Sequence, residues 1–218
     1  MRIFAIGDIH GCSTALDTLL SIIPLQPEDV LITLGDYVDR GPNSKKVIDT
    51  LIALKGRCQL VTLKGNHEIM MSEARLNMNA LVDWCHCGGS TTLDSYNVRS
   101  FEDIPAAHWD FIEKALPYYE TDDHFFVHAN AASHVELAEQ SPDMLFWERF
   151  GKPKPHQSGK IMVCGHTPQT SGHPKDVGHA ICIDTHVYAN GWLTCLEVQS
   201  RQYWQAKENG KTRTGSLK

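Results

Sequence analysis

The first 65 residues alternate between short apolar runs and longer amphipathic segments. Apolar runs at 2–6, 30–34 and 59–63 each have the length of a buried β-strand. The intervening segments, 13–23 and 42–54, repeat apolar residues every three or four positions, as a helix with one buried face does. Because strands that alternate with helices form parallel sheets with right-handed crossovers, this pattern predicts a β-α-β-α-β unit.

The rest of the chain divides into a helical part and a β-rich part. Residues 67–120 predict mostly helices, which we expect to form a cap beside any functional site. Further strands are predicted at 125–127, 161–164, 180–183, 193–198 and 202–205. The stretch 151–159 is rich in Pro and Lys and predicts an exposed loop. Since no repeat or linker interrupts the pattern, we expect one domain over 1–206 and a polar, frayed tail over 207–218.

Each strand of the first unit ends in a turn that carries polar chemistry. The turns read GDIHG from residue 7, GDYVDRG from residue 35 and GNHE from residue 65. A turn needs glycine for its backbone angles, but it does not need charged side chains, because unpaired charges at a strand end are costly. Ligands of parallel sheets bind beyond the carboxyl ends of the strands. The three turns therefore predict one site of metal or phosphate chemistry.

Together these motifs resemble the phosphoprotein phosphatase branch of the metallophosphoesterase (calcineurin-like) superfamily, whose motifs read GDxHG, GDxVDRG and GNHE. The resemblance extends to Val127-His128-Ala129, to the GHTP motif from residue 165 and to the segment 84–96, and it covers about residues 1–198. In length and motif style the chain is similar to compact bacterial and phage lambda-type serine/threonine phosphatases. The resemblance implies an α/β fold in which a central β-sandwich of mixed sheets is flanked by helices.

The resemblance also implies a binuclear metal centre. The first ion would be held by Asp8, His10 and Asp36, and the second by Asp36, Asn66, His128 and His166. Oxygen and nitrogen ligands without thiolate favour Mn²⁺, with Fe or Zn²⁺ as the alternatives. Two cations about 3.5–4 Å apart would lower the pKa of a bridging water, and the resulting hydroxide would attack phosphorus directly.

Catalytic roles follow from the same resemblance. His67 would be the general acid for the leaving alkoxide, and Asp39 would orient its imidazole. Arg40 would bind phosphate oxygens bidentately, with Asn66 also contacting the substrate. Arg149, in a short WER motif, is the best match for the family's second phosphate-binding arginine. The competing interpretation at each position is structural, as caps, turn residues, ion pairs or core histidines, and it is strongest for Arg149.

Two triplets depart from simple expectations. Asp184-Thr185-His186 stands where relatives often carry Asp-Thr-Gly. We interpret His186 as a neutral replacement at a tolerant turn, and a direct role in the site is the alternative. The CHC triplet at 85–87 invites a zinc interpretation, but its spacing is unlike that of zinc sites and no second cysteine pair follows.

Composition limits the partners. The 218 residues include 20 basic and 26 acidic side chains, for a net charge of −6, and no Lys/Arg cluster indicates nucleic-acid binding. No apolar run approaches the roughly 20 residues that span a bilayer, so we expect no membrane partner. The N-terminus lacks the pattern of a signal peptide, and the seven cysteines are an odd number. We therefore expect a cytoplasmic protein with reduced thiols.

Three functions remain for this sequence. The leading one is a metal-dependent phosphomonoesterase, a serine/threonine protein phosphatase that also accepts phosphotyrosine. The alternative is a bis(5'-nucleosyl)-tetraphosphatase that hydrolyses diadenosine tetraphosphate, since those enzymes share the same motifs. Their chains are usually longer, which favours the first function. A non-catalytic phosphoprotein-binding module is disfavoured because every predicted ligand is present. The predicted partners are thus phosphorylated proteins or peptides, or a phosphorylated small molecule.

Overall fold

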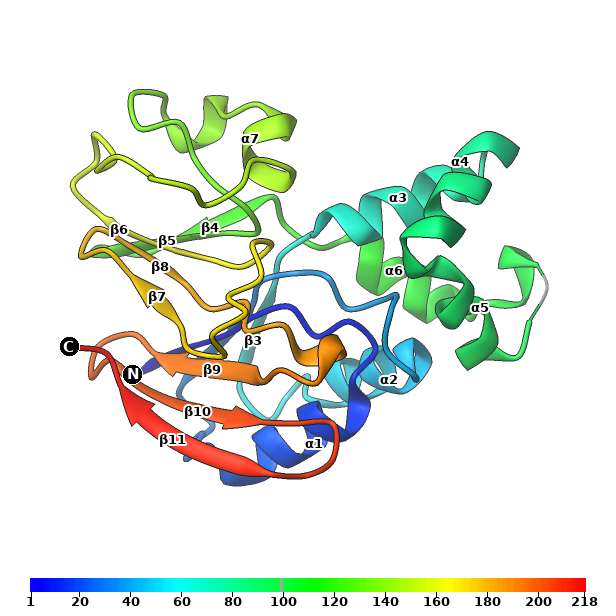
Figure 1. Cartoon of the computed structure of the whole chain (residues 1–218), viewed down its shortest axis with the longest axis horizontal. Coiled ribbons are helices and arrows are strands. Elements are labelled where there is room, and N and C mark those ends of the chain that lie inside the picture. The colour runs from blue at the N-terminus through cyan, green and yellow to red at the C-terminus, as the bar shows by residue number, and fades with distance from the viewer. Residues whose placement is uncertain (99) are drawn as a thin grey trace.

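Two mixed β-sheets stack face to face in the centre of the molecule, as a computed structural model that describes residues 1–98 and 100–218 shows (Figure 1). The first sheet has six strands in the order β11-β10-β9-β1-β2-β3. Its strands are β1 (Ile3–Ile6), β2 (Val30–Thr33), β3 (Gln59–Thr62), β9 (Leu193–Glu197), β10 (Gln202–Ala206) and β11 (Thr212–Ser216). Strands β1, β2 and β3 run parallel, which confirms the unit predicted for the first 65 residues.

The second sheet has five strands in the order β4-β5-β6-β8-β7. They are β4 (Tyr118–Glu120), β5 (His124–Val127), β6 (Ile161–Cys164), β7 (Lys175–Asp176) and β8 (Ala180–Cys182). The central strands β5, β6 and β8 run parallel, whereas β4 and β7 pair antiparallel at the edges. Both sheets therefore contain three neighbouring parallel strands, whose carboxyl ends can present side chains at one edge of the sandwich.

The alternation of side chains along β1 explains how the layers form. Ile3 and Ala5 face the second sheet in the inner core, while Phe4 and Ile6 face the helices on the outside. The helices α1 (Ser13–Ile22) and α2 (Ser44–Ala53) contribute to the same outer core. Burying one such large apolar side chain stabilises the fold by about 1.5–3 kcal/mol. On the far side, the short helix α7 (Pro142–Phe146) contributes to a third core over the second sheet.

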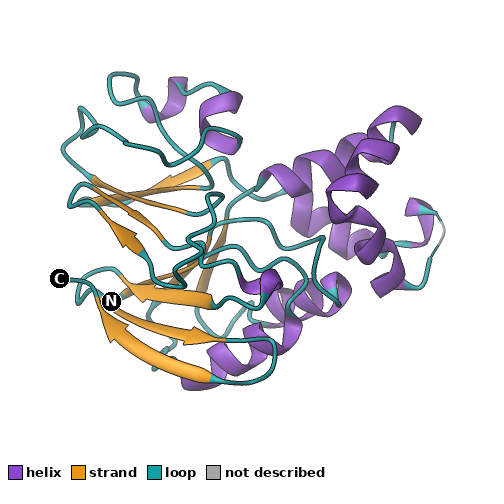
Figure 2. Cartoon of the chain, in the orientation of Figure 1, coloured by secondary structure: helices purple, strands orange, loops and turns teal. Residues whose placement is uncertain are grey.

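A group of helices projects to one side of the sandwich, as Figures 1 and 2 show. It consists of α3 (Asn66–Ala74), α4 (Met78–Trp84), a π-helical turn (Cys85–Gly89), α5 (Ser90–Tyr96), a 3₁₀ turn (Phe101–Asp103) and α6 (Ala106–Glu113). These helices correspond to the predicted cap, but its predicted end at residue 120 includes strand β4. Further 3₁₀ turns lie at Leu137–Glu139 and Val187–Ala189.

The C-terminal segment differs from the sequence prediction. Instead of a frayed tail, Thr212–Ser216 form β11, which pairs antiparallel with β10 at the edge of the first sheet. The segment is polar and alternates no apolar residues, so its own pattern gives no strand signal. Backbone hydrogen bonds to β10 decide its conformation. Among the described residues, no helix is long and apolar enough to cross a membrane.

Candidate metal centre

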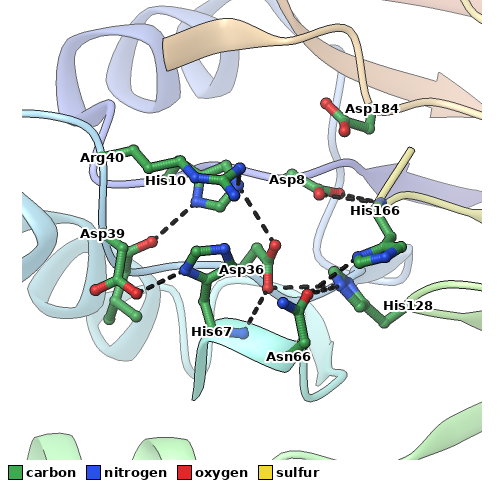
Figure 3. A network of polar contacts seen from close by, with 12 residues as sticks. Asp8, His10, Asp36, Asp39, Arg40, Asn66, His67, His128, His166 and Asp184 are labelled. Atoms are coloured by element: carbon green, nitrogen blue, oxygen red, sulfur yellow. Dashed lines mark hydrogen bonds and ion pairs between the residues drawn. The ribbon is translucent and has the colours of Figure 1, made fainter. Parts of the chain in front are cut away.

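The predicted ligands converge where the parallel strands of both sheets end. Asp8 and His10 follow β1, Asp36 follows β2, and Asn66 opens α3 just after β3. From the second sheet, His128 follows β5 and His166 follows β6. Figure 3 shows Asp36 in the middle of this group, with His10 on one side and Asn66, His128 and His166 on the other. The two sheets thus supply one shared site.

Asp36 belongs to two clusters of possible ligands. Its Oδ2 lies 3.4 Å from His10 Nε2, and its Oδ1 lies 3.5 Å from His128 Nε2. Asn66 Oδ1 lies 2.9 Å from His128 Nε2 and 3.0 Å from His166 Nδ1. Over residues 1–98 and 100–218, two groups are compact enough for one ion each, namely His10/Asp36/His67 and Asp36/His128/His166. A carboxylate common to both groups is suited to bridging two cations.

Asp8 is placed differently from the other predicted ligands. Its two carboxylate oxygens accept from the backbone N–H of His166, at 3.1 and 3.0 Å. It belongs to neither compact group. Asp184, two residues after the end of β8, lies near it. Burial together with the charges of Asp184 and Asp36 raises the pKa of Asp8 well above its ordinary value. Burial raises the pKa of Asp184 to about 7. Bound cations would compensate this concentration of buried carboxylates.

Backbone carbonyls fix the ring nitrogen that each histidine offers. His10 Nδ1 lies 3.0 Å from the carbonyl of Val38, and His128 Nδ1 lies 2.8 Å from that of Leu34. Because a carbonyl only accepts, these nitrogens carry the proton, and Nε2 keeps a lone pair for a metal. His166 has the opposite tautomer, since its Nε2 donates to the carbonyl of Trp147 at 3.0 Å. Burial lowers the pKa of all three, that of His166 to about 4, so the imidazoles are neutral.

This donor set fits divalent cations. It combines carboxylate and amide oxygens with neutral imidazole nitrogens, and it contains no thiolate. Neither Cys85 nor Cys87 contributes to a compact group among the described residues, and both are free thiols. The residues can therefore hold metal ions, while the identity of the metal stays a prediction.

His67, which belongs to the first compact group, forms a buried pair with Asp39. His67 Nδ1 lies 2.6 Å from Asp39 Oδ2, and the side chains are 1% and 0% exposed. The same Asp39 oxygen accepts from Trp84 Nε1 at 2.8 Å, and Oδ1 accepts from Thr92 Oγ1 at 2.7 Å. Burial lowers the pKa of His67, but the carboxylates of Asp36 and Asp39 outweigh it, so the pKa lies above its ordinary value. The imidazole can thus carry a proton toward the centre.

The two predicted arginines are both exposed, but they lie in different surroundings. Arg40 places its guanidinium 4.6 Å from the ring centre of Tyr188, and its Nη1 donates to His10 Nε2 at 3.0 Å. Its backbone approaches Gly88 so closely that a Cβ there would meet the Arg40 nitrogen at 2.9 Å. Among the described residues the Arg149 side chain forms no ion pair or hydrogen bond, whereas its carbonyl accepts from Asn130 Nδ2 at 2.9 Å. Two residues earlier, the carbonyl of Trp147 accepts from His166, so this segment borders the site.

Five of the ten predicted site residues adopt left-handed backbone conformations, which non-glycine residues rarely do. They are His10, Asp36, Asp39, Arg40 and His166, with φ between 45° and 73°. Such positions cost about 1–3 kcal/mol each and cluster at functional sites. His186 has the same conformation, with φ 65°, and its ring packs edge-on against Tyr188 at 4.7 Å. Glycine adopts this conformation without strain, so the backbone here is compatible with the Asp-Thr-Gly that the resemblance implies.

Three supporting residues received no role from the sequence. Glu68 is completely buried and accepts from the backbone N–H of Asp36, Tyr37 and Gly65, at 2.8–2.9 Å. Trp84 and Thr92 are also buried, and both bind Asp39. The GNHE motif and the Trp84–Tyr96 resemblance contain these residues, so motif membership was the available signal. Apart from the contact of Glu68 with Gly65 inside the motif, these contacts span 31 to 53 positions, which no local pattern encodes.

Two curated proteins are similar to this chain over most of its length. The chain is 27% identical over 210 residues to serine/threonine-protein phosphatase 1 of Salmonella typhimurium, covering 91% of this chain and 92% of the relative. It is 30% identical over 225 residues to an asymmetrical bis(5'-nucleosyl)-tetraphosphatase of Geobacillus thermodenitrificans, covering 90% of each chain.

A solved structure shows the same fold, namely that of a cold-active protein-tyrosine phosphatase from a psychrophilic Shewanella. The two structures superpose with a TM-score of 0.66 at 16% identity, over 98% of this chain and 80% of the other. The family model described as calcineurin-like phosphoesterase matches residues 1–194. Since that match covers most of the chain, the protein belongs to the calcineurin-like phosphoesterases.

Proposed function

We propose that this phosphoesterase removes phosphate from phosphoserine and phosphothreonine in proteins. The observation that supports it is the shared position of Asp36 between two ligand clusters, next to the His67–Asp39 pair. The proposed ligands are Asp8, His10, Asp36, Asn66, His128 and His166. Two bound cations, with Mn²⁺ as the proposed metal, would supply a water nucleophile near neutral pH and neutralise charge on the phosphoryl oxygens.

The chain's own residues would orient the substrate and move the proton. Arg40 and Arg149 bind the phosphoryl oxygens, because a guanidinium matches two of them at once. His67 donates its proton from Nε2 to the leaving oxygen of serine or threonine, while Asp39 holds Nδ1 and stabilises the charged ring. A serine alkoxide is a poor leaving group, so this proton transfer is needed for the bond to break.

A second candidate function is hydrolysis of a bis(5'-nucleosyl) tetraphosphate. The relative from Geobacillus thermodenitrificans supports it, because each chain covers 90% of the other. Their lengths are therefore similar, and the length argument in favour of a protein phosphatase does not apply to this relative. The chemistry differs at the leaving group, since a nucleotide phosphate leaves without the protonation that an alkoxide requires.

The first experiment compares turnover of a phosphoserine peptide and of diadenosine tetraphosphate by the manganese-loaded protein, with a metal-free control. Higher kcat/KM for the peptide supports the protein phosphatase, and the reverse supports the second candidate. A His67→Asn variant adds a chemical test. It should lose more turnover on phosphoserine than on the dinucleotide if His67 protonates the leaving group.

The site assignment is tested separately with p-nitrophenyl phosphate. Asp8→Asn should lower its turnover, because it removes a proposed ligand. His67→Asn should lower it less than it lowers phosphoserine turnover, because p-nitrophenolate leaves without protonation. Full activity of both variants would contradict the assignment.

A further inference from the structure

A pocket of about 360 Å³ lies next to the candidate centre, between the segments 130–134 and 148–154. It is connected to the predicted ligands through short contacts. Asn130, two positions after His128, donates to the carbonyl of Arg149 at 2.9 Å. The backbone N–H of Phe150 donates to Thr167 Oγ1 at 2.8 Å, and Thr167 directly follows His166. The pocket therefore borders the side of the centre that His128 and His166 form.

The pocket is positively charged although the protein is acidic. Segment 149–160 contains Arg149, Lys152, Lys154 and Lys160 and no acidic residue, in a chain of net charge −6. Lys160 is paired with Glu120 at 2.8 Å. The other three are exposed and form no ion pair within the described part of the chain. Three cations thus face the single carboxylate of Glu148 in the pocket lining, and such an excess attracts anions.

The loop that carries these lysines is held in place, although its sequence predicted only an exposed loop. Buried His156 donates from Nε2 to the carbonyl of Val135 at 2.9 Å. His179 donates from Nε2 to the carbonyl of Pro153, also at 2.9 Å. These contacts fix the backbone on both sides of Lys154. A preorganised loop binds a charged partner at a lower ordering cost than a mobile one.

We propose that this basic pocket binds acidic side chains that flank the phosphorylated residue, so the protein selects acidic phosphopeptides. This inference rests on the proposed function. Arg149 lies at the edge of the pocket and is the proposed second phosphate-binding residue, so a peptide whose phosphate it contacts runs past Lys152 and Lys154. Exposed lysines act as adaptable point charges, which suits carboxylates at variable positions along a peptide.

The test compares two phosphoserine peptides that differ only in having aspartates or alanines around the phosphoserine. For the wild-type protein we expect kcat/KM to be about three- to tenfold higher for the acidic peptide, through a lower KM, because a few exposed charge pairs give an effect of this size. In Lys152→Ala/Lys154→Ala the ratio should fall to about one. High salt should lower the wild-type ratio as well.

A control variant removes the same charge elsewhere. Lys55 and Lys114 are exposed and lie on a different surface, so Lys55→Ala/Lys114→Ala should keep the wild-type ratio. If the ratio of kcat/KM fell equally in both double variants, the effect would come from net charge, and the proposal would be overturned. A wild-type ratio of one would overturn it too.

Fluorescence anisotropy separates this proposal from the proposed function. A labelled acidic phosphopeptide should bind the wild-type protein more tightly than Lys152→Ala/Lys154→Ala, whether or not it is hydrolysed. If neither peptide is turned over, the proposed function fails. The binding difference alone then tests whether the pocket binds acidic peptides. The double variant could instead lose binding of diadenosine tetraphosphate while its peptide binding stays unchanged. That result would show that the pocket binds polyphosphate and would contradict the proposal.

Discussion

Asp39 shows how one buried residue couples the candidate centre to the helical group. Its carboxylate accepts from His67 of α3, Trp84 of α4 and Thr92 of α5, and its own backbone N–H donates to Thr92 Oγ1 at 2.8 Å. A buried carboxylate is costly unless donors surround it, and here every partner is a donor. The charge that stabilises a protonated His67 is therefore kept in a fixed position.

We expect Asp39→Asn to lower kcat on a phosphoserine peptide about 100-fold. Asparagine keeps the shape of the side chain but removes the charge that stabilises the imidazolium of His67. Metal content, measured by elemental analysis, should stay at the wild-type level. Asp94→Asn, an exposed position on α5, is the matched control and should keep full activity. Equal kcat in both variants would show that the carboxylate has no role in catalysis.

His186 gives a second prediction at this scale. Glycine adopts φ 65° without strain, so His186→Gly should change the free energy of unfolding by less than about 1 kcal/mol and leave the metal content intact. The matched control is His166→Gly, which has a similar φ of 61° but removes a proposed ligand. Only this control should lose metal. Loss of a metal from His186→Gly would assign His186 to the centre.

At the scale of elements, the start of α3 is locked to the turn after β2. Glu68 Oε2 accepts from the backbone N–H of Asp36 and of Gly65, both at 2.9 Å, and Oε1 accepts from Tyr37 at 2.8 Å. Two turns that carry predicted ligands are thus held together by one buried carboxylate. Backbone donors in such turns have no partner of their own, so the side chain satisfies them.

Glu68→Gln should therefore destabilise the protein by about 2–4 kcal/mol. The new amide group would face the two N–H donors at the former Oε2 position, and both would lose their acceptor. Urea unfolding measures the change. Glu73→Gln lies on the exposed part of the same helix and should be neutral. A similar urea midpoint for both variants would contradict the proposal that Glu68 holds the two turns together.

The pairing of Arg2 with Asp29 predicts a pH dependence. Asp29, just before β2, accepts from the backbone N–H of Arg2 at 3.0 Å and from its guanidinium Nη2 at 2.6 Å. Burial would raise the pKa of Asp29, but these hydrogen bonds outweigh it and lower the pKa. The stabilisation is thus complete above the unfolded value of about 3.9 and is lost as pH falls through the lower folded value.

Urea unfolding at several pH values tests this. The difference in stability between wild type and Asp29→Asn should be constant from about pH 5 to 7 and shrink below about pH 4. Asp122→Asn, at an exposed turn between β4 and β5, should show no such difference. A wild-type advantage that stays the same at low pH would rule out the linkage.

At the scale of the whole molecule, the candidate centre joins the two sheets. Asp36 and Asn66 come from the first sheet, whereas His128 and His166 come from the second, and the four side chains meet within hydrogen-bond distances. Bound cations would therefore stabilise the packing of the sandwich as well as the site. They would also compensate the buried carboxylates of Asp8, Asp36 and Asp184.

Metal removal should accordingly lower the thermal stability of the entire domain. At free metal concentrations of 100 to 1,000 times Kd, binding adds about 2.7–4.1 kcal/mol, so we expect EDTA to lower Tm by roughly 10 °C. Thermal unfolding with manganese or EDTA measures this. Asp36→Asn should remove most of the difference, because both clusters contain Asp36. An unchanged Tm in the wild-type protein would argue against a centre that couples the sheets.

Local sequence patterns predicted the parallel strands and the turns after them. Alternation and helical spacing depend on neighbours within a few positions, so β1, β2 and β3 were predicted with bounds within one residue of the structure. Because parallel strands end at a common edge, the convergence of the predicted ligands also followed from the sequence. The substrate did not follow, since the chain is similar to relatives named for two different activities, at 27% and 30% identity.

The sequence by itself thus determined the family motifs, the strand ends and the residue types of the candidate centre. Only the tertiary structure decided that β11 pairs with β10, that Trp84 and Thr92 bind Asp39, and that His156 and His179 fix a basic loop beside His166. These contacts join residues far apart along the chain. Their free energy depends on how complete elements pack, which no short window of sequence records.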